Sequence, residues 1–163
     1  MAAITFEEIM FTIMSATQDT FKSYMSTEVF AGHVEKKVDP VDSDVVGIVG
    51  IAGDRVGYIL FATEMDTARH IAMDMLMLDE ADDESIRDTI GELANNIAGA
   101  FKTRYHQQYG SVALGLPLIV SGKLRPVSDE EGAASMNVAC KGVTIPFKSE
   151  DGRLNFRVMV YMG

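Results

Sequence analysis

The sequence has few of the features that mark secreted, membrane-spanning or disulfide-bonded proteins. It contains one cysteine, Cys140, so no disulfide can form within the chain. No apolar run reaches the roughly 18 residues that a membrane-spanning helix needs. The first ten residues, MAAITFEEIM, lack the basic start of a signal peptide. These absences predict a cytoplasmic protein without a membrane span.

Positive charge is also scarce. The chain has 14 Lys and Arg residues against 24 Asp and Glu residues, which gives a formal net charge of -10. Proteins that bind nucleic acids or anionic membrane surfaces use Lys and Arg to contact phosphate groups. The composition therefore argues against both kinds of partner, and the net charge favours solubility.

The motifs of several common catalytic sites are absent. The sequence has no Gly-rich phosphate loop, no G-x-S-x-G motif and no Cys/His cluster with zinc spacing. His33, His70 and His106 are isolated from one another, and we assign them to surface or boundary positions. Cys140 lies among alternating apolar residues, which favours an inert buried thiol over a nucleophile. We expect no metal or cofactor belonging to this chain.

What the sequence does contain indicates a globular domain. Its 163 residues are 47% hydrophobic, which predicts a single domain over residues 1–163 with a sizeable core. The eleven methionines suit either gaps in that core or an adaptable binding surface, and we assign those of the predicted helices to the core.

Apolar periodicity alternates between helix and strand along the chain. Thr5 and Glu8 have the spacing of a capping box, and Asp66 or Thr67 is a candidate cap for a second helix. The acidic run 79–84 precedes a third helix, where the helix dipole favours negative charge, and it lacks the spacing and the glycine of a calcium loop. The predicted elements are helix 5–25, strand 29–40, strands 44–52 and 55–62, helix 64–78, helix 86–105, extended segment 111–122, exposed loop 123–134 and strands 135–146 and 153–162.

This order predicts an α+β fold, with three main helices and an antiparallel sheet of about six strands. It also indicates a pseudo-twofold internal repeat, because each half has a helix followed by a strand hairpin. The residues FKSY that begin at Phe21 resemble the residues FKTRY that begin at Phe101. This similarity covers only a few residues, so chance is the alternative to an internal repeat.

The helix at 86–105 has an unusual polar face. Its apolar residues fall on one side, and Glu92, Asn95, Asn96, Gly99 and Thr103 fall on the other. Asn and Gly are poor helix formers, and solvent-facing helix surfaces are usually rich in Lys, Glu, Gln and Arg. A solvated face is the simplest interpretation of the Glu-x-x-Asn string, but the residues that follow favour a functional one.

The segment GELANNIAGAFKTRY, which begins at Gly91, resembles the signature helix of the CheC/CheX family of chemotaxis phosphatases, whose shared motif is Glu-x-x-Asn. If Phe21 is matched to Phe101, Thr12 and Ser15 stand opposite Glu92 and Asn95. The chain is therefore similar to the single-motif CheX type. The resemblance implies a CheX-like fold, a homodimer, and hydrolysis of the phospho-aspartate of a CheY-like response regulator that carries Mg²⁺.

The same resemblance assigns catalysis to Glu92 and Asn95. Hydrolysis needs a water molecule in line with the phosphorus, and an amide can accept a hydrogen bond from water while donating to phosphoryl oxygens. Asn95 is the candidate for this role, and Glu92 is the candidate partner for a Lys of the regulator. We also assign Gly99 and three polar neighbours to the partner-binding surface: Asp88, Asn96 and Thr103.

Two other functions remain open at this point. One is a non-catalytic adaptor of the same fold that docks a response regulator or a flagellar-switch component. The other is a structural dimerisation or sensory domain. An intact Glu92/Asn95 pair favours the enzyme over the adaptor.

Overall fold

The computed structural model describes residues 4–38, 40–124 and 141–163, which form an α+β structure with one antiparallel sheet. Three helices and seven strands follow one another in these ranges. They are α1 (Phe6–Met25), β1 (Val29–Ala31), β2 (Val41–Gly53), β3 (Gly57–Thr63), α2 (Met65–Leu76), α3 (Asp83–Tyr109), β4 (Val112–Leu114), β5 (Leu118–Leu124), β6 (Lys141–Ser149) and β7 (Asn155–Met162).

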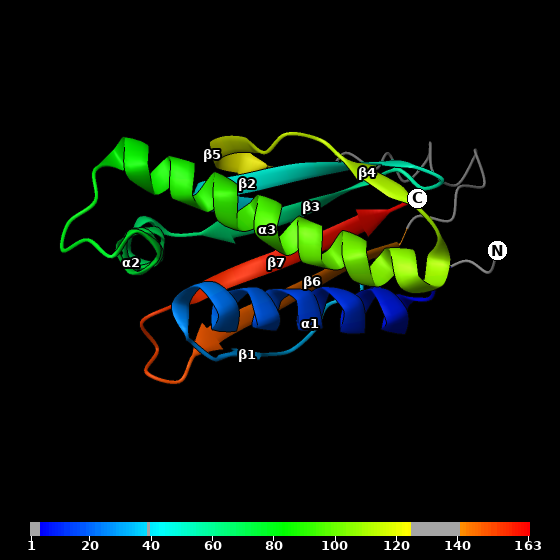
Figure 1. The fold of residues 1–163 in the computed structure, drawn as a ribbon, viewed down its shortest axis with the longest axis horizontal. Coiled ribbons are helices and arrows are strands. Elements are labelled where there is room, and N and C mark those ends of the chain that lie inside the picture. The colour runs from blue at the N-terminus through cyan, green and yellow to red at the C-terminus, as the bar shows by residue number, and fades with distance from the viewer. Residues whose placement is uncertain (1–3, 39, 125–140) are drawn as a thin grey trace.

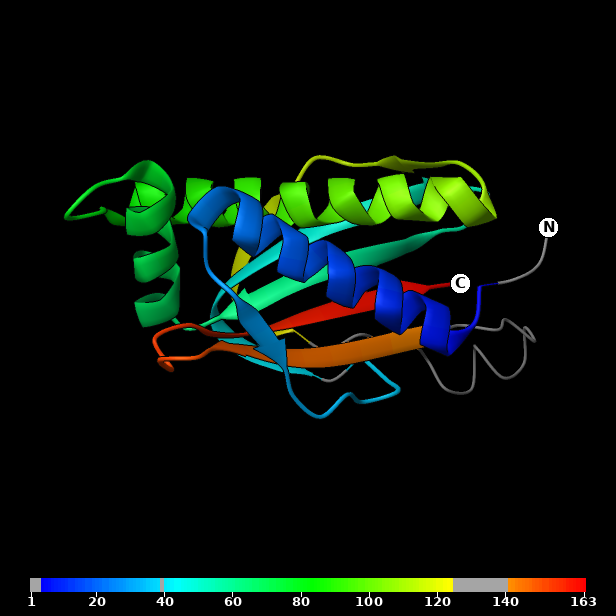
Figure 2. The same ribbon diagram turned by 60° about the horizontal axis from the view of Figure 1, so that its bottom comes forward.

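The sheet has the strand order β1-β6-β7-β3-β2-β4, and β5 pairs with β2 beside β4. α1 and α3 lie side by side across one face of the sheet, and α2 stands at one end, near the N-terminal half of α3 (Figure 1, Figure 2). The fold class expected from the sequence is therefore confirmed.

The strand pairing has the pattern expected of two related halves. The hairpins β2–β3 and β6–β7 meet through β3 and β7 at the centre of the sheet. The short strand after each long helix then pairs with the other half's hairpin: β1 with β6, and β4 with β2. Phe21 of α1 and Phe101 of α3, which the sequence echo matches, are both fully buried.

The main core lies between the sheet and the helices. Phe21, Phe61, Phe147 and Phe156 form its aromatic centre, in which Phe156 stacks on the other three rings at 4.6–5.3 Å between centroids. A smaller apolar cluster lies on the opposite face of the sheet. It consists of Val41, Val46, Leu60, Ala62 and Met159.

The N-terminal caps of α1 and α3 can be compared with the capping residues predicted from the sequence. The capping box of α1 is present, since the Glu8 amide donates to the Thr5 hydroxyl and the Thr5 amide donates to the Glu8 carboxylate. Asp82 caps α3 by accepting from the Ser85 amide at 2.8 Å, and its hydrogen bonds from Ser85 hold the pKa of Asp82 below its usual value. The acidic run therefore lies at the start of a helix, as expected, and Asp82 also caps it; α3 is longer than predicted.

The predicted cap of α2 is wrong. Neither Asp66 nor Thr67 occupies the N-cap position, which belongs to Glu64, and the Glu64 side chain makes no capping bond. The Met65 amide donates instead to the Asp44 carboxylate of β2 at 2.9 Å. Burial of Glu64, together with the nearby Asp44 carboxyl, raises the pKa of Glu64.

The strand predicted over residues 29–40 is also too long. β1 ends at Ala31, opposite Phe147, and the next residue of β6 is Pro146, which has no amide to donate to a sheet ladder. The chain stays beside β6, because the Gly32 amide donates to the Pro146 carbonyl and Glu35 forms a single bridge with Thr144.

The assignment of helix methionines to the core holds in part. Met10, Met14, Met25 and Met75 pack against the main core, but Met77 follows α2 in a left-handed conformation and is 91% exposed. The interpretation of Cys140 and the predictions for residues 125–140 lie outside the described residues.

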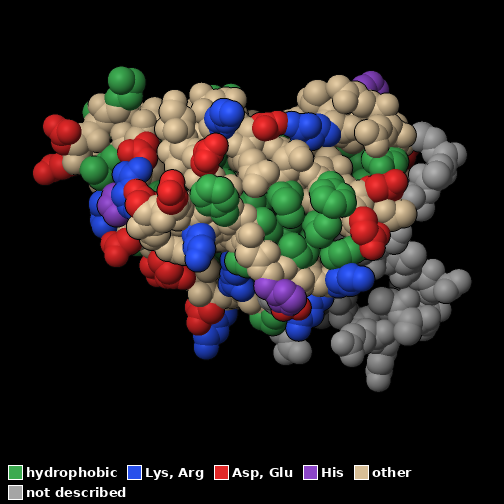
Figure 3. Space-filling view, turned by 90° about the horizontal axis from the view of Figure 1, so that it is seen from below, with side chains coloured by type: hydrophobic (Ala, Val, Ile, Leu, Met, Phe, Trp, Pro, Cys, Tyr) green, Lys and Arg blue, Asp and Glu red, His purple; other side chains and the backbone are tan. Residues whose placement is uncertain are grey.

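The side of the molecule that carries α1 and β1 has apolar side chains gathered among charged ones (Figure 3). Phe11 of α1 and Phe30 of β1 are both exposed. No helix in the described ranges combines the length and the apolar character that crossing a membrane requires.

Candidate functional site

The middle of α3 rests closely on the sheet because small residues meet there. A Cβ atom placed on Gly47 of β2 would lie only 2.9 Å from the Cβ of Ala94. One placed on Gly91 would lie 3.3 Å from Cδ1 of Ile119 in β5 and 3.9 Å from Cβ of Pro117. This close packing fixes the height and rotation of the helix at the turn that carries Glu92 and Asn95.

The C-terminal half of α3 is anchored by aromatic packing. Phe101 stacks on Tyr105 at 5.9 Å between ring centroids, and Tyr105 contacts Tyr109 at 5.3 Å. Burial raises the pKa of both tyrosines, Tyr105 and Tyr109. The helix is therefore held along its length, which suits a surface that must present side chains at fixed positions.

The outer strip of α3 carries three of the predicted site residues. Asp88, Glu92 and Asn95 are exposed and lie within about 60° of one another around the helix axis. No hydrogen bond or ion pair joins these three side chains to the other described residues. A carboxylate and an amide at positions i and i+3 are therefore available together to a partner.

Gly99 continues this strip one turn beyond Asn95. A Cβ atom at Gly99 would meet no other atom within 4 Å, so nothing in the described structure requires a glycine there. Thr103 is exposed, and its hydroxyl donates to the Gly99 carbonyl at 3.1 Å. The absence of a side chain at Gly99 leaves the helix backbone open to close approach.

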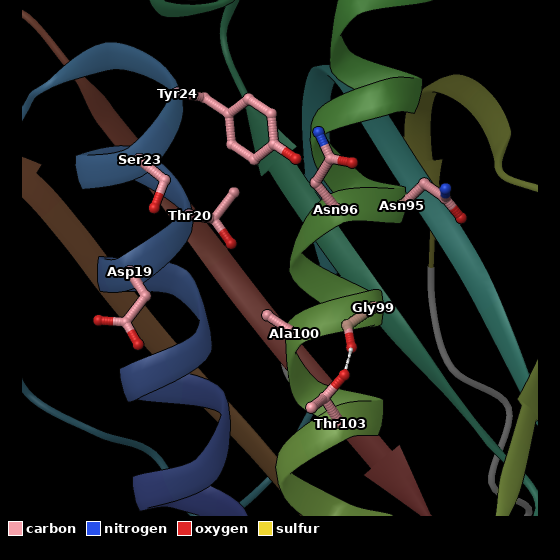
Figure 4. A pocket seen from close by; sticks show the side chains of 9 residues that line it. All are labelled: Asp19, Thr20, Ser23, Tyr24, Asn95, Asn96, Gly99, Ala100 and Thr103. Carbon is pink, nitrogen blue, oxygen red and sulfur yellow. Dashed lines mark hydrogen bonds between the residues drawn. The ribbon is translucent and has the colours of Figure 1, made fainter.

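Asn96 is placed differently from its neighbour. It is half-buried rather than exposed, and its amide points toward Tyr24 of α1, whereas Asn95 points to the other side of α3 (Figure 4). Asn96 is one wall residue of a groove of about 470 Å³ between the two helices. α1 contributes Asp19, Thr20, Ser23 and Tyr24 to this groove, and α3 contributes Asn95, Asn96, Gly99, Ala100 and Thr103.

The structure thus brings four of the predicted site residues to one groove and leaves Asp88 and Glu92 on the strip beside it. The α1 wall of the groove was not predicted from the sequence. The similarity between the segments at Phe21 and Phe101 was the available signal, because it set Ser23 against Thr103. An ion pair between Asp19 and Arg104 joins the two helices at this groove.

The described residues contain no group of three or more His, Cys, Asp or Glu side chains that could hold a metal ion. The chemistry that the strip offers is that of two carboxylates, Asp88 and Glu92, one amide and an open stretch of backbone. Such a set can bind a cation and position a water molecule.

A family model described as chemotaxis phosphatase CheX matches residues 45–148. The chain belongs to this family, and its three helices and curled antiparallel sheet are those of the related structures. No curated protein matches the sequence.

Three solved structures illustrate the likeness. A chemotaxis protein CheX from Desulfovibrio desulfuricans is 22% identical, with a TM-score of 0.80 over 96% of this chain and 99% of that one. The CheX–CheY–BeF3–Mg²⁺ complex from Borrelia burgdorferi is 21% identical, with a TM-score of 0.73 over 94% and 97%. FliY from Thermotoga maritima is 15% identical, with a TM-score of 0.60 over 99% and 91%. At these identities the likeness establishes the fold.

Proposed function

We propose that this protein is a phosphatase that hydrolyses the phospho-aspartate of a CheY-like response regulator. The observation that carries the proposal is the exposed pair of Glu92 and Asn95 on a rigidly seated helix, free of bonds to the other described side chains. Membership of the CheX family supports it, and so does the related complex, in which CheX is bound to CheY with beryllofluoride, a mimic of the phosphoryl group.

Asn95 has the chemistry that hydrolysis of an acyl phosphate requires from a helper protein. A water molecule must approach phosphorus in line with the departing carboxylate. The amide carbonyl accepts a hydrogen bond from this water, and the amide NH₂ donates to a phosphoryl oxygen. Positioning of this kind contributes a large part of the rate in phosphoryl transfer, so Asn95 needs neither a nucleophile nor a metal of its own beside it.

Glu92 and Gly99 place the regulator over Asn95. Glu92 lies one turn before Asn95 and pairs with a Lys of the regulator in a charge-assisted hydrogen bond. Gly99 lies one turn after Asn95 and leaves room for the regulator's backbone. The Mg²⁺ that we expect in the complex belongs to the regulator, and Asp88 and Thr103 extend the contact surface along α3.

The experiment incubates the protein with phosphorylated response regulators from the same organism and follows loss of the phosphoryl group. The expected result is faster loss from one regulator than from the others. We expect this activity to serve signalling in the cytoplasm. A protein that binds a regulator in its activated state without speeding loss from any of them would instead be the non-catalytic adaptor.

We further propose that the protein forms a homodimer through β5. Among the described residues β5 pairs only with β2, so the other edge of Leu118–Leu124 has no strand partner within that part of the chain. Pairing that edge with a second copy would satisfy its backbone groups. The expected mass in solution is about twice 17.8 kDa, and replacing Ser121 with proline should shift it to that of the monomer, because Val120 pairs with Val46 of β2 and the backbone of its neighbour Ser121 faces the other edge. A monomeric wild-type protein would contradict this proposal.

A further inference from the structure

The groove between α1 and α3 has one wall that the Glu-x-x-Asn motif does not account for. Asn95 and Gly99 line this groove and also belong to the outer strip of α3, so the two surfaces adjoin along the helix, with the Asn95 side chain pointing away from α1 (Figure 4). The opposite wall consists of polar and aromatic side chains of α1, among which Ser23 and Tyr24 are exposed.

Asn96 faces this wall with an unused hydrogen-bond donor. Its amide nitrogen, Nδ2, is buried and has no hydrogen-bond partner among the described residues. A buried donor without an acceptor costs free energy, and asparagine also lowers helix stability relative to alanine. The folded chain on its own would therefore be better served by alanine at this position, which indicates that the amide is retained for something outside the chain.

Tyr24 lies directly beside this amide. Its side chain is 54% exposed, and its hydroxyl end points toward Asn96 across the groove (Figure 4). An exposed tyrosine offers a large apolar contact surface with a polar tip and loses little conformational entropy on binding, which is why tyrosine is enriched at protein interfaces. The two residues therefore combine an unsatisfied donor with a ready contact surface.

We propose that the groove is a second recognition site for the response regulator, beside the catalytic strip. In the complex, the Asn96 side chain turns outward so that Nδ2, buried in the free chain, donates a hydrogen bond to an oxygen atom of a regulator loop, and Tyr24 packs against the same loop. This inference rests on the proposed function for the identity of the partner. It assigns Asn96 and Tyr24 to partner selection, whereas Asn95 acts on the phosphoryl group.

The test measures the dissociation constant for the beryllofluoride-activated regulator, together with the rate of dephosphorylation at saturation. Asn96→Ala and Tyr24→Ala should each weaken binding by roughly two- to tenfold, the value of one hydrogen bond or one modest contact, without slowing the saturated rate more than about twofold. Asn96→Ala should also leave the melting temperature unchanged or higher. Tyr58→Ala is the matched control, because Tyr58 is 51% exposed on β3 and lies outside the groove.

Binding that is unchanged in both Asn96→Ala and Tyr24→Ala would overturn the inference, even if Asn95→Ala abolishes activity. A lower melting temperature for Asn96→Ala, with affinity unchanged, would show that Asn96 serves packing and would overturn it too. If the wild-type protein binds the regulator but never speeds hydrolysis, the proposed enzyme activity fails, while weaker binding by the two variants still supports the groove as a recognition site.

Discussion

α1 and α3 occupy matched places in the two halves of the fold, and only α3 carries the Glu-x-x-Asn motif. Both helices begin at a side-chain cap, pack on the same face of the sheet and bury a phenylalanine at the matched position. Where α3 has Glu92, Asn95 and Gly99, the matched residues of α1 are Thr12, Ser15 and Asp19.

The difference lies in what the polar groups are bound to. On α1, the Thr12 hydroxyl donates to the Glu8 carbonyl at 2.6 Å, and Asp19 is paired with Arg104. On α3, Glu92 and Asn95 make no such bonds to the described residues. The Thr12 and Asp19 side chains of α1 are thus bonded within the chain, whereas the Glu92 and Asn95 side chains of α3 remain available to a partner.

The largest expected effect comes from removing the amide on α3. Asn95→Ala should lower the rate of regulator dephosphorylation by roughly 10²-fold or more, because the attacking water loses its orienting group. Ser15→Ala, at the matched position of α1, should change the rate by less than about twofold, within the range of a neutral surface substitution. Equal losses in the two variants, measured by loss of the phosphoryl label, would contradict the assignment of catalysis to α3 alone.

A smaller effect is expected from placing a lysine at the matched position of each helix. Glu92→Lys should weaken regulator binding by about tenfold or more, since it places two positive charges together where we expect an ion pair. Thr12→Lys places the same residue at the matched position of α1 and should leave affinity within about twofold of the wild type. Titration calorimetry with the activated regulator measures both. If Glu92→Lys leaves the affinity for the regulator unchanged, Glu92 is not part of the docking surface.

The smallest expected effect distinguishes two glycines of α3. Gly99→Ala should raise the melting temperature by about 2–4 °C, because alanine favours the helix by about 1 kcal/mol and has free space there. The same change should slow dephosphorylation by roughly fivefold, the cost of crowding an interface by about 1 kcal/mol.

Gly91→Ala provides the control for this pair. Its new Cβ would lie 3.3 Å from Ile119, so the gain in melting temperature should be reduced or absent. If Gly99→Ala is as active as the wild-type protein, close approach of the regulator at that point is refuted.

The sequence allowed the α+β class and the outer strip of α3 to be predicted because both depend on local periodicity. A helix repeats every 3.6 residues, so Glu92, Asn95 and Gly99 had to share a face once the helix was assigned. Paired capping residues such as Thr5 and Glu8 are likewise local, and they were found correctly.

The features that were missed depend on contacts between distant segments. The end of β1 depends on Pro146, and the start of α2 depends on Asp44 of a preceding strand. The α1 wall of the groove and the burial of Asn96 exist only because α1 packs against α3. Asn96 also lies about 100° around the helix from Asn95, at the boundary between the outer strip and the helix contact, where periodicity alone does not decide exposure.

The most direct test of the account is the rate constant for phosphoryl loss when the regulator is saturated with Asn95→Ala protein, with binding measured on the same samples. We expect the variant to bind the activated regulator about as well as the wild type, while the phosphoryl group is lost at nearly the regulator's own unassisted rate. A saturated rate equal to that of the wild-type protein would contradict the role of Asn95.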